Sequence, residues 1–208
     1  MAYFAIMPRD FSRGFLLIFP PFGGKMDKKT EFFTAKRVAI LGMMTAVAYL
    51  LTLLSFPIFP MAPFLMLDFS FSIMLLAGYM LGPLSSLIIV VVVNLLGAIG
   101  SSGGITGAVA NTVTAMVFVC IPSLVYKYKK GLKWVVLVLF ACILLQCAVA
   151  LPMNRYVTFY IYHISNPAGL FAEVWWCILL FNFIKGVSNG LITILLYKRL
   201  KNLLGKFL

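Results

Sequence analysis

The residues best suited to chemistry in this chain of 208 residues are a few polar side chains set in long apolar stretches. Lys185 lies in the middle of one such stretch, and Asp68 lies where the chain turns back into another. A charged side chain in apolar surroundings costs several kcal/mol unless it has a partner or reaches water. Both residues are therefore candidates for contacting a ligand.

Three asparagines are weaker candidates of the same kind. Asn182 lies three residues before Lys185, and on a helix the two share a face, so they would present an amide and a cation to the interior of a helix bundle. Asn94 and Asn111 are isolated amides in two other apolar stretches. These amides could contact a ligand, but single amides inside membranes also hydrogen-bond between helices.

A structural interpretation is open for the charged residues too. Lys185 could bond, together with Asn182, to carbonyl groups of neighbouring helices. Asp68 could serve as the N-cap of the helix that follows it, because aspartate is favoured at that position. The sequence alone leaves these interpretations open beside ligand contact.

Motifs of zinc peptidases and nucleotide-binding enzymes are absent from the sequence. There is no His-Glu-x-x-His pattern, no Walker A loop and no pair of acidic residues within one apolar stretch. The only histidine, His163, has no catalytic partner beside it. We therefore expect no enzyme. Without a nucleotide site the chain cannot power transport by itself, so it could bind, conduct or serve as one subunit of a larger machine.

The composition is that of an integral membrane protein. Hydrophobic residues make up 63% of the chain and charged residues 11%, and the mean hydropathy is +1.07, far above the values of soluble domains. A spanning helix needs roughly 20 residues, so about six crossings use up the chain. We expect an all-α fold, a polytopic bundle of six transmembrane helices, with no separate soluble catalytic domain.

Neither the charge nor the cysteines point to another class. The net charge is +12, but the basic residues gather at the ends of apolar stretches, as in the positive-inside pattern, and nucleic-acid binding is not expected. The four cysteines lie in apolar stretches without metal-ligand spacing. We expect them to be small buried residues that form no disulfide framework.

Apolar stretches and breaker residues predict the six spans and their connections. Three prolines interrupt residues 57–63, glycines dominate 100–104, and residues 154–173 form an expected loop of aromatic and polar residues. The second stretch is short for a full crossing. The expected spans are about 38–56, 69–81, 83–99, 105–126, 134–153 and 174–197.

The positions of the basic residues predict the orientation. In a six-span arrangement three basic clusters fall on one side, which would be the cytoplasm, with both termini inside a plasma membrane. The three loops on the other side could form a lid over an extracellular cavity. The basic clusters are Lys25, Lys28, Lys29, Lys36 and Arg37; Lys127, Lys129, Lys130 and Lys133; and Lys198, Arg199, Lys201 and Lys206.

The chain is expected to divide into two parts. Residues 1–30 are interpreted as a cytoplasmic extension that could be disordered. Residues 31–208 are interpreted as the membrane domain that binds substrate. Because Met26 is followed by Asp27-Lys28-Lys29, the first 25 residues could be dispensable or a misassigned start.

Several stretches, in order and spacing, resemble one family: the riboflavin-specific substrate-binding subunit, or S component, of the energy-coupling factor vitamin transporters. The resemblance covers about residues 36–208. It rests on short stretches that occur in the family's order. They are Lys36-Arg37 with the following span that holds Gly42 and Ala46, residues 63–70, Gly82-Pro83, residues 94–96, residues 107–111, and residues 181–200.

The resemblance implies a six-helix bundle that holds one vitamin near the outer face, with riboflavin as transported ligand rather than cofactor. Asn182 and Lys185 match family positions expected to contact the flavin, and Leu67, Asp68 and Phe69 would lie at the mouth of the pocket. Asn94 and Asn111 belong to the resembling stretches. Alternatives are a stand-alone permease and an S component for another flavin or vitamin, such as a flavin nucleotide or analogue.

The resemblance also implies partners. Transport would require a transmembrane coupling subunit and two cytoplasmic ATPases, and the small-residue pair Gly42 and Ala46 in the first span would be the docking surface. Such pairs also arise by chance in a chain rich in small residues.

The sequence departs from the family pattern at two positions. Phe71 follows Ser70 where an aspartate is usual, and Val93 stands where a lysine commonly precedes the asparagine. A planar flavin ring favours aromatic and apolar walls with a few fixed donors. Aromatic residues expected near such a pocket are Phe64, Phe69, Trp175 and Trp176.

Overall fold

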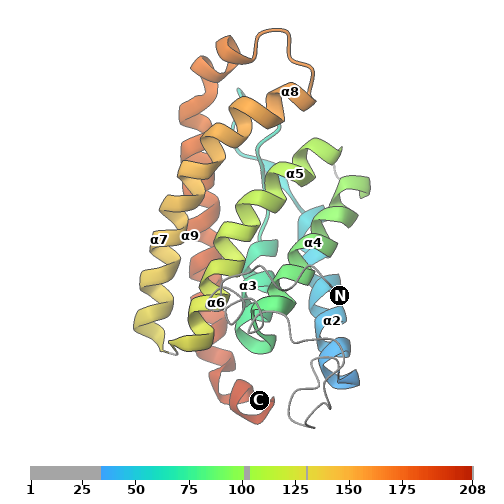
Figure 1. Ribbon diagram of the computed structural model, residues 1–208, viewed down its shortest axis with the longest axis vertical. Helices are drawn as coiled ribbons and strands as arrows, with labels where there is room; N and C mark the ends of the chain where they lie inside the picture. Colours follow the sequence, from blue (N-terminus) through green and yellow to red (C-terminus); the bar gives the residue numbers. More distant parts are fainter. Residues whose placement is uncertain (1–33, 101–103, 130, 208) are drawn as a thin grey trace, which may run out of the picture. The chain divides into compact units, whose positions relative to one another are not determined.

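The computed structural model describes residues 34–100, 104–129 and 131–207. Side chains are described as far as residue 99 in the first range and residue 197 in the last. Residues 39–208 form one compact unit, and the description below concerns that unit together with the start of its first helix (Figure 1). Two predicted features lie outside the described residues. One is the extension 1–30, including the start that could be dispensable, and the other is most of the glycine-rich connection.

Helices dominate the described chain. Two five-residue π-helical segments join neighbouring helices, so that α5 to α6 and α7 to α8 are each continuous. The helices are α2 (Ala35–Leu53), α3 (Ser70–Leu81), α4 (Pro83–Gly100), α5 (Gly104–Ala115), α6 (Ile121–Tyr128), α7 (Leu132–Met153), α8 (Phe159–Ile161) and α9 (Pro167–Phe207), and the π segments are η2 (Met116–Cys120) and η3 (Asn154–Thr158).

The expected all-α membrane bundle is confirmed. Four of the described helical stretches are long and apolar enough to cross a membrane, namely 35–53, 104–128, 132–161 and 167–197. The other two expected spans, α3 and α4, are apolar but shorter. The 12 residues of α3 are about 18 Å long, against roughly 30 Å of hydrocarbon, so this helix reaches only partway across.

The expected long loop 154–173 is wrong. Helix α7 continues through η3 and α8 to Ile161, and α9 begins at Pro167, where proline is well tolerated because the first helical N–H needs no partner. Only residues 162–166 connect the two helices. The segment looks like a loop in the sequence because polar residues such as Asn154 and Thr158 interrupt the apolar run, yet both are buried.

Prolines mark both π segments. Pro122 is the second residue after η2, and Pro152 lies inside α7 two residues before η3 begins. Proline removes one helical hydrogen bond and crowds the carbonyl four residues earlier, and a wider turn relieves this crowding. The two helical stretches therefore stay continuous.

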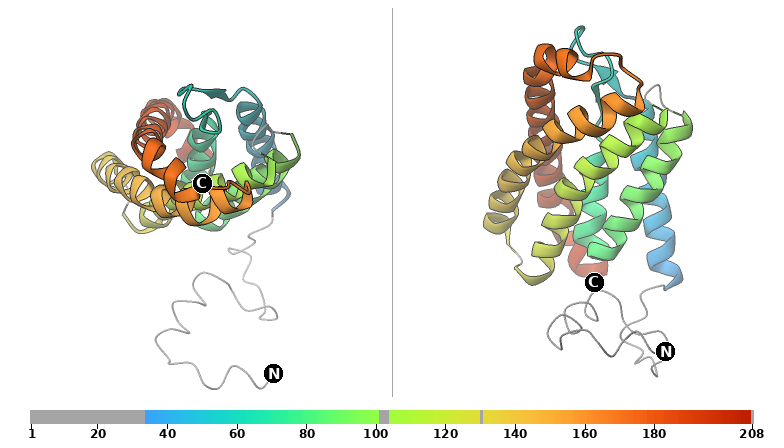
Figure 2. Two further views of the ribbon diagram at one scale, coloured as in Figure 1. Left: turned by 90° about the horizontal axis from the view of Figure 1, so that it is seen from above. Right: turned by 45° about the horizontal axis from the view of Figure 1, so that its top comes forward.

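A short antiparallel ribbon crosses the connection between α2 and α3. Strand β1 (Phe56–Pro57) pairs with β2 (Met66–Leu67), with Phe56 opposite Leu67 and Pro57 opposite Met66. Figure 2 shows the ribbon at the same end of the unit as α8 and the start of α9. Because β2 ends at Leu67, the ribbon fixes where Asp68 enters the bundle.

Two apolar clusters hold the unit together. One surrounds Phe71, Phe118 and Ile143, and the other lies towards the ribbon around Phe159 and Ile178. Helices α7 and α9 approach closely, because a Cβ atom on Gly186 would lie 2.9 Å from the side chain of Ile143.

The predicted burial of the cysteines holds for three of the four. Cys142, Cys147 and Cys177 are buried among apolar residues, Cys120 is half-buried, and all four are free.

Candidate functional site

A cavity lies between the connection that carries the ribbon and the helices α2, α4, α5 and α9. Its volume is about 880 Å³, counting the part that is open at its mouth. It is lined by Thr52, Ser55, Phe64, Leu65, Met66, Asp68, Val93, Asn94, Gly97, Gly107, Ala108, Ala110, Asn111, Thr114, Asn154, Thr158, Tyr162, Phe181, Asn182 and Lys185. Five of the seven residues predicted to bind ligand are among them.

The two charged residues of the cavity form an ion pair. Lys185 Nζ lies 2.7 Å from Asp68 Oδ2, and their side chains are 4% and 6% exposed. A buried charge is tolerable only when its partner and hydrogen bonds are well placed. Asp68 meets this condition, because its other oxygen accepts hydrogen bonds from the backbone N–H and the hydroxyl of Ser70.

Asp68 serves the start of α3 much as the sequence allows, although Phe69 is the N-cap residue of that helix, and its contact with a ligand stays a prediction. Its bond from the Ser70 N–H satisfies one of the unpaired donors at the start of α3, as a capping residue does. Its other oxygen binds the ammonium group of Lys185, which lies on α9.

The asparagines of α4 and α5 extend the ion pair into a chain. Lys185 Nζ donates to Asn111 Oδ1 at 2.8 Å, and Asn111 Nδ2 donates to Asn94 Oδ1 at 2.7 Å. Asn94 Nδ2 donates to the carbonyl of Val90 in its own helix at 2.7 Å. The two amides thus join α4 to α5, as the structural interpretation predicts, and they also lie on the cavity wall.

Asn182 is held from behind by a glutamine that the sequence analysis did not single out. Gln146 Nε2, fully buried in α7, donates to Asn182 Oδ1 at 3.3 Å, and Asn182 Nδ2 donates to the carbonyl of Ile178 at 2.8 Å. Gln146 could have been found as a lone amide in an otherwise apolar helix.

The two departures from the family pattern both lie at the site. Phe71 is fully buried, and its ring centre is 4.4 Å from Lys185 Nζ, a favourable cation–π geometry. Val93 is fully buried and lines the cavity. Both positions give the cavity apolar or aromatic surroundings.

Several predicted neighbours of the pocket lie elsewhere. Leu67 and Phe69 belong to the apolar cluster around Phe159 and are not among the residues that line the cavity. Trp175 and Trp176 are 47% and 43% exposed on α9. Of the four expected aromatic residues, only Phe64 lines the cavity, because the direction of each side chain depends on how its helix or ribbon is rotated.

The segment 154–162 adds lining residues that the expected loop concealed. Asn154 and Thr158 come from η3, and Tyr162 follows α8. Asn154 Nδ2 donates to the carbonyl of Ala150 at 2.8 Å. Burial raises the pKa of the Tyr162 phenol, so this hydroxyl stays neutral near pH 7.

Gly42 and Ala46, the predicted docking pair, are exposed on α2. Their neighbours Met43, Val47 and Leu50 are 64%, 43% and 58% exposed, so this face of the helix is apolar and uncovered. A Cβ atom on Gly42 would meet nothing within 4 Å.

The chemistry of the site is that of binding. Within the described ranges, no three His, Cys, Asp or Glu side chains come together to hold a metal ion. The cavity offers amides, hydroxyls and one paired ammonium group beside apolar walls, the usual make-up of a small-molecule site.

Comparison with protein families gives one match over most of the chain. The family described as "ECF transporter, substrate-specific component" matches residues 36–197.

Curated relatives and a solved structure agree with this match. The chain is 34% identical over 174 residues to a protein named riboflavin transporter RibU from Staphylococcus aureus, covering 81% of this chain and 92% of that protein. It is 28% identical to riboflavin transporter FmnP from Bacillus subtilis, covering 80% and 92%. A solved structure described as the S component of a bacterial ECF transporter has a TM-score of 0.72 and 33% identity, covering 82% of this chain and 98% of that one.

Proposed function

Because this chain belongs to the substrate-specific components of ECF transporters, a family of transport subunits and not of enzymes, we propose that it binds riboflavin and delivers it to a coupling subunit driven by two ATPases. Two relatives named as riboflavin transporters support the ligand. The proposed ligand-contacting residues are Asp68, Asn94, Asn111, Asn182 and Lys185.

The arrangement of the three cavity amides is the observation that carries the proposal. The side-chain oxygens of Asn94, Asn111 and Asn182 each accept a hydrogen bond from within the protein. Each side-chain nitrogen donates one hydrogen bond to the protein, and an amide nitrogen carries two hydrogens. One N–H per amide is therefore available to a ligand.

A flavin complements such a donor-rich wall. The isoalloxazine ring presents carbonyl oxygens and ring nitrogens that accept hydrogen bonds, and its flat faces suit apolar surfaces such as those of Val93, Phe64 and Phe181.

The charge of the cavity favours riboflavin over its phosphate ester. Lys185 and Asp68 are the charged residues among the cavity lining, and they neutralise each other. A phosphate group brought into this cavity would be desolvated without a free cation to balance it. We expect the unphosphorylated vitamin to bind more tightly than the flavin nucleotide.

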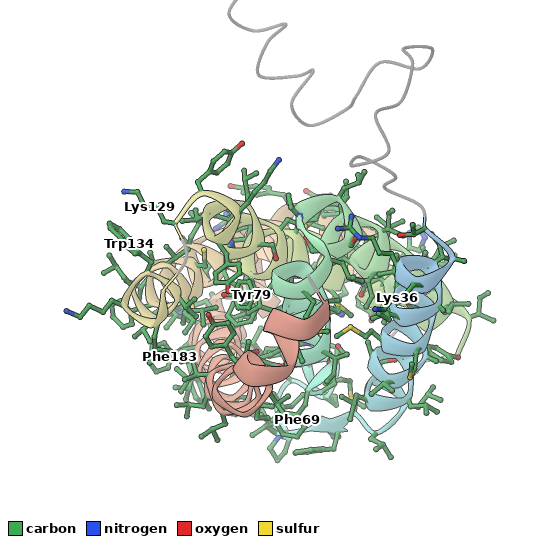
Figure 3. All side chains as sticks on the ribbon, turned by 90° about the horizontal axis from the view of Figure 1, so that it is seen from below. Lys36, Phe69, Tyr79, Lys129, Trp134 and Phe183 are labelled. Atoms are coloured by element: carbon green, nitrogen blue, oxygen red, sulfur yellow. The ribbon has the colours of Figure 1, made fainter. Side chains whose placement is uncertain are left out.

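The proposed orientation places the mouth of the cavity outside the cell. Lys127, Lys129 and Lys133 flank the connection between α6 and α7, at the end of the unit opposite the ribbon, and this basic end would face the cytoplasm. In the view from below in Figure 3, Lys129 and Trp134 lie together at the edge of the unit, and Lys129 Nζ is 4.0 Å from the ring centre. Such residues suit the headgroup region. Both termini would then be cytoplasmic.

The test is riboflavin binding to the full-length protein purified in detergent, followed by quenching of flavin fluorescence. We expect saturable quenching of riboflavin fluorescence that excess thiamine and folate leave unchanged. Titrated separately, flavin mononucleotide should bind more weakly. Reconstituted alone in liposomes, the protein should bind riboflavin without moving it inside. Absence of saturable binding would refute the ligand, and transport by the protein alone would favour a stand-alone permease.

A further inference from the structure

A second layer of polar residues lies behind the ion pair, out of reach of the cavity. Asn189 is fully buried on α9, one turn after Lys185, and Ser72 is 1% exposed in the first turn of α3. Neither residue lines the cavity. Buried polar groups of this kind are costly unless each hydrogen-bonding atom has a partner.

The side-chain oxygen of Asn189 binds the start of α3. Asn189 Oδ1 lies 2.9 Å from the backbone nitrogen of Ser72 and 2.8 Å from its hydroxyl oxygen, and both groups can donate to it. The Ser72 N–H also lies 3.2 Å from the carbonyl oxygen of Phe69. Donors in the first turn of a helix lack the usual intrahelical partner, so Asn189 caps α3 from another helix.

The side-chain nitrogen of Asn189 touches the backbone of both members of the ion pair. Asn189 Nδ2 donates to the carbonyl oxygen of Asp68 at 3.0 Å and to that of Lys185 at 3.0 Å. An amide offers two N–H donors and two acceptor sites. All four are therefore used, and they fix three points: the start of α3, Asp68 two residues before that helix, and the preceding turn of α9.

We infer that Ser72 and Asn189 form a clamp that positions the Asp68–Lys185 ion pair, and that they thereby set ligand affinity without touching the ligand. The ion pair joins residues 117 positions apart. Its contribution to stability depends on a geometry held to a fraction of an ångström. Without the clamp, α3 and α9 could shift along each other, which would lengthen the 2.7 Å contact and move Lys185 Nζ away from Asn111.

The first test compares two serines of equal burial. Ser72→Ala removes a hydroxyl from the clamp. Ser123→Ala is the matched control, because Ser123 is also 1% exposed, and its hydroxyl donates to the Val119 carbonyl of its own helical stretch at 2.6 Å. Both variants should lower the unfolding temperature in detergent by similar amounts. Only Ser72→Ala should also weaken riboflavin binding, by about three- to tenfold.

Two further variants sharpen the affinity test. Ser72→Thr keeps a hydroxyl and should bind riboflavin within about twofold of the wild type. Asn189→Leu removes all four bonds at similar size and should weaken binding by more than tenfold. If Asn189→Leu does not fold, the two Ser72 variants carry the test. Wild-type affinity in Ser72→Ala would overturn the inference.

The inference rests on the proposed function only where riboflavin affinity is measured. The second test therefore uses no ligand. The loss of unfolding temperature caused by Ser72→Ala is measured in the wild type and in Asp68→Asn/Lys185→Met, where the ion pair is absent. We expect at least half of the loss to disappear in that background, whereas the loss caused by Ser123→Ala should be equal in both. An unchanged loss for Ser72→Ala would overturn the clamp.

The outcomes of the two proposals are distinguishable. Failure of the wild type to bind riboflavin counts against the proposed ligand, and the stability cycle still decides the clamp. Tight binding by the wild type with no coupling between Ser72 and the ion pair supports the ligand and refutes the clamp.

Discussion

Helices α9 and α2 are both long and apolar enough to cross a membrane, yet they are used in opposite ways. Of the most apolar 18 residues of each helix, 44% are buried in α9 and 6% in α2. Polar residues of α9, including Asn182, Lys185 and Asn189, are buried and hydrogen-bonded to α7, α5 and α3 respectively. Helix α2 instead presents an open apolar face around Gly42 and Ala46. Similar hydropathy can thus build a site or leave a surface for lipid or another protein.

Removing the cation from α9 should have the largest effect on binding. Lys185→Met leaves Asp68 buried without its partner, and we expect riboflavin affinity to fall by about 100-fold, equal to about 2.7 kcal/mol. Titration calorimetry in detergent measures the change. The double variant Asp68→Asn/Lys185→Met should regain unfolding temperature but not affinity, since it removes both charges. Wild-type affinity in Lys185→Met would remove Lys185 from the proposed ligand contacts.

Removing one amide of the chain should have a smaller effect. Asn111→Leu deletes the acceptor for Lys185 and one N–H proposed for the ligand, and we expect about a tenfold loss of affinity. The matched control is Thr112→Val on the same helix, whose hydroxyl only donates to the Ala108 carbonyl of its own helix, at 2.7 Å. It should bind as the wild type does. Equal losses in the two variants would indicate general loosening of α5.

Changes on α2 should have the smallest effect on affinity. Ala46→Leu adds bulk to an exposed position outside the cavity, so riboflavin binding should stay within about twofold of the wild type. Uptake by cells or by the complete transporter in liposomes should fall strongly, because a bulky residue keeps a partner helix at a distance. Ala141→Leu, the same change at an exposed position of α7, is the control. Normal uptake in Ala46→Leu would refute the docking assignment.

The accuracy of the sequence analysis followed the strength of the local signal. Apolar stretches, prolines and glycines located α3 and α4 to within one residue at each end. The start of α9 was predicted seven residues late, because Pro167 and Gly169 resemble turn residues and Glu173 interrupts the apolar stretch. The π segments escaped prediction, since a change of hydrogen-bond register leaves little trace in composition.

The same contrast holds within the site. Lys185 and Asp68 stand out in the sequence because an isolated charge in an apolar stretch demands a partner. Their pairing with each other could not be read from the sequence, because 117 positions separate them and α3 had to be placed against α9. Gln146, Ser72 and Asn189 escaped notice, since uncharged polar residues in helices are common and acquire their meaning from a neighbour.

The sequence by itself determined that this is a helical membrane protein, which family it resembles and which residues carry buried charge. Those properties depend on composition and on local order along the chain, where the cost of burying a charge or breaking a helix is already fixed. Only the tertiary structure decided which aromatic residues face the cavity, how the amides are oriented and what holds the ion pair together. Those properties depend on the rotation and register of helices, which are set by packing between residues far apart in the sequence.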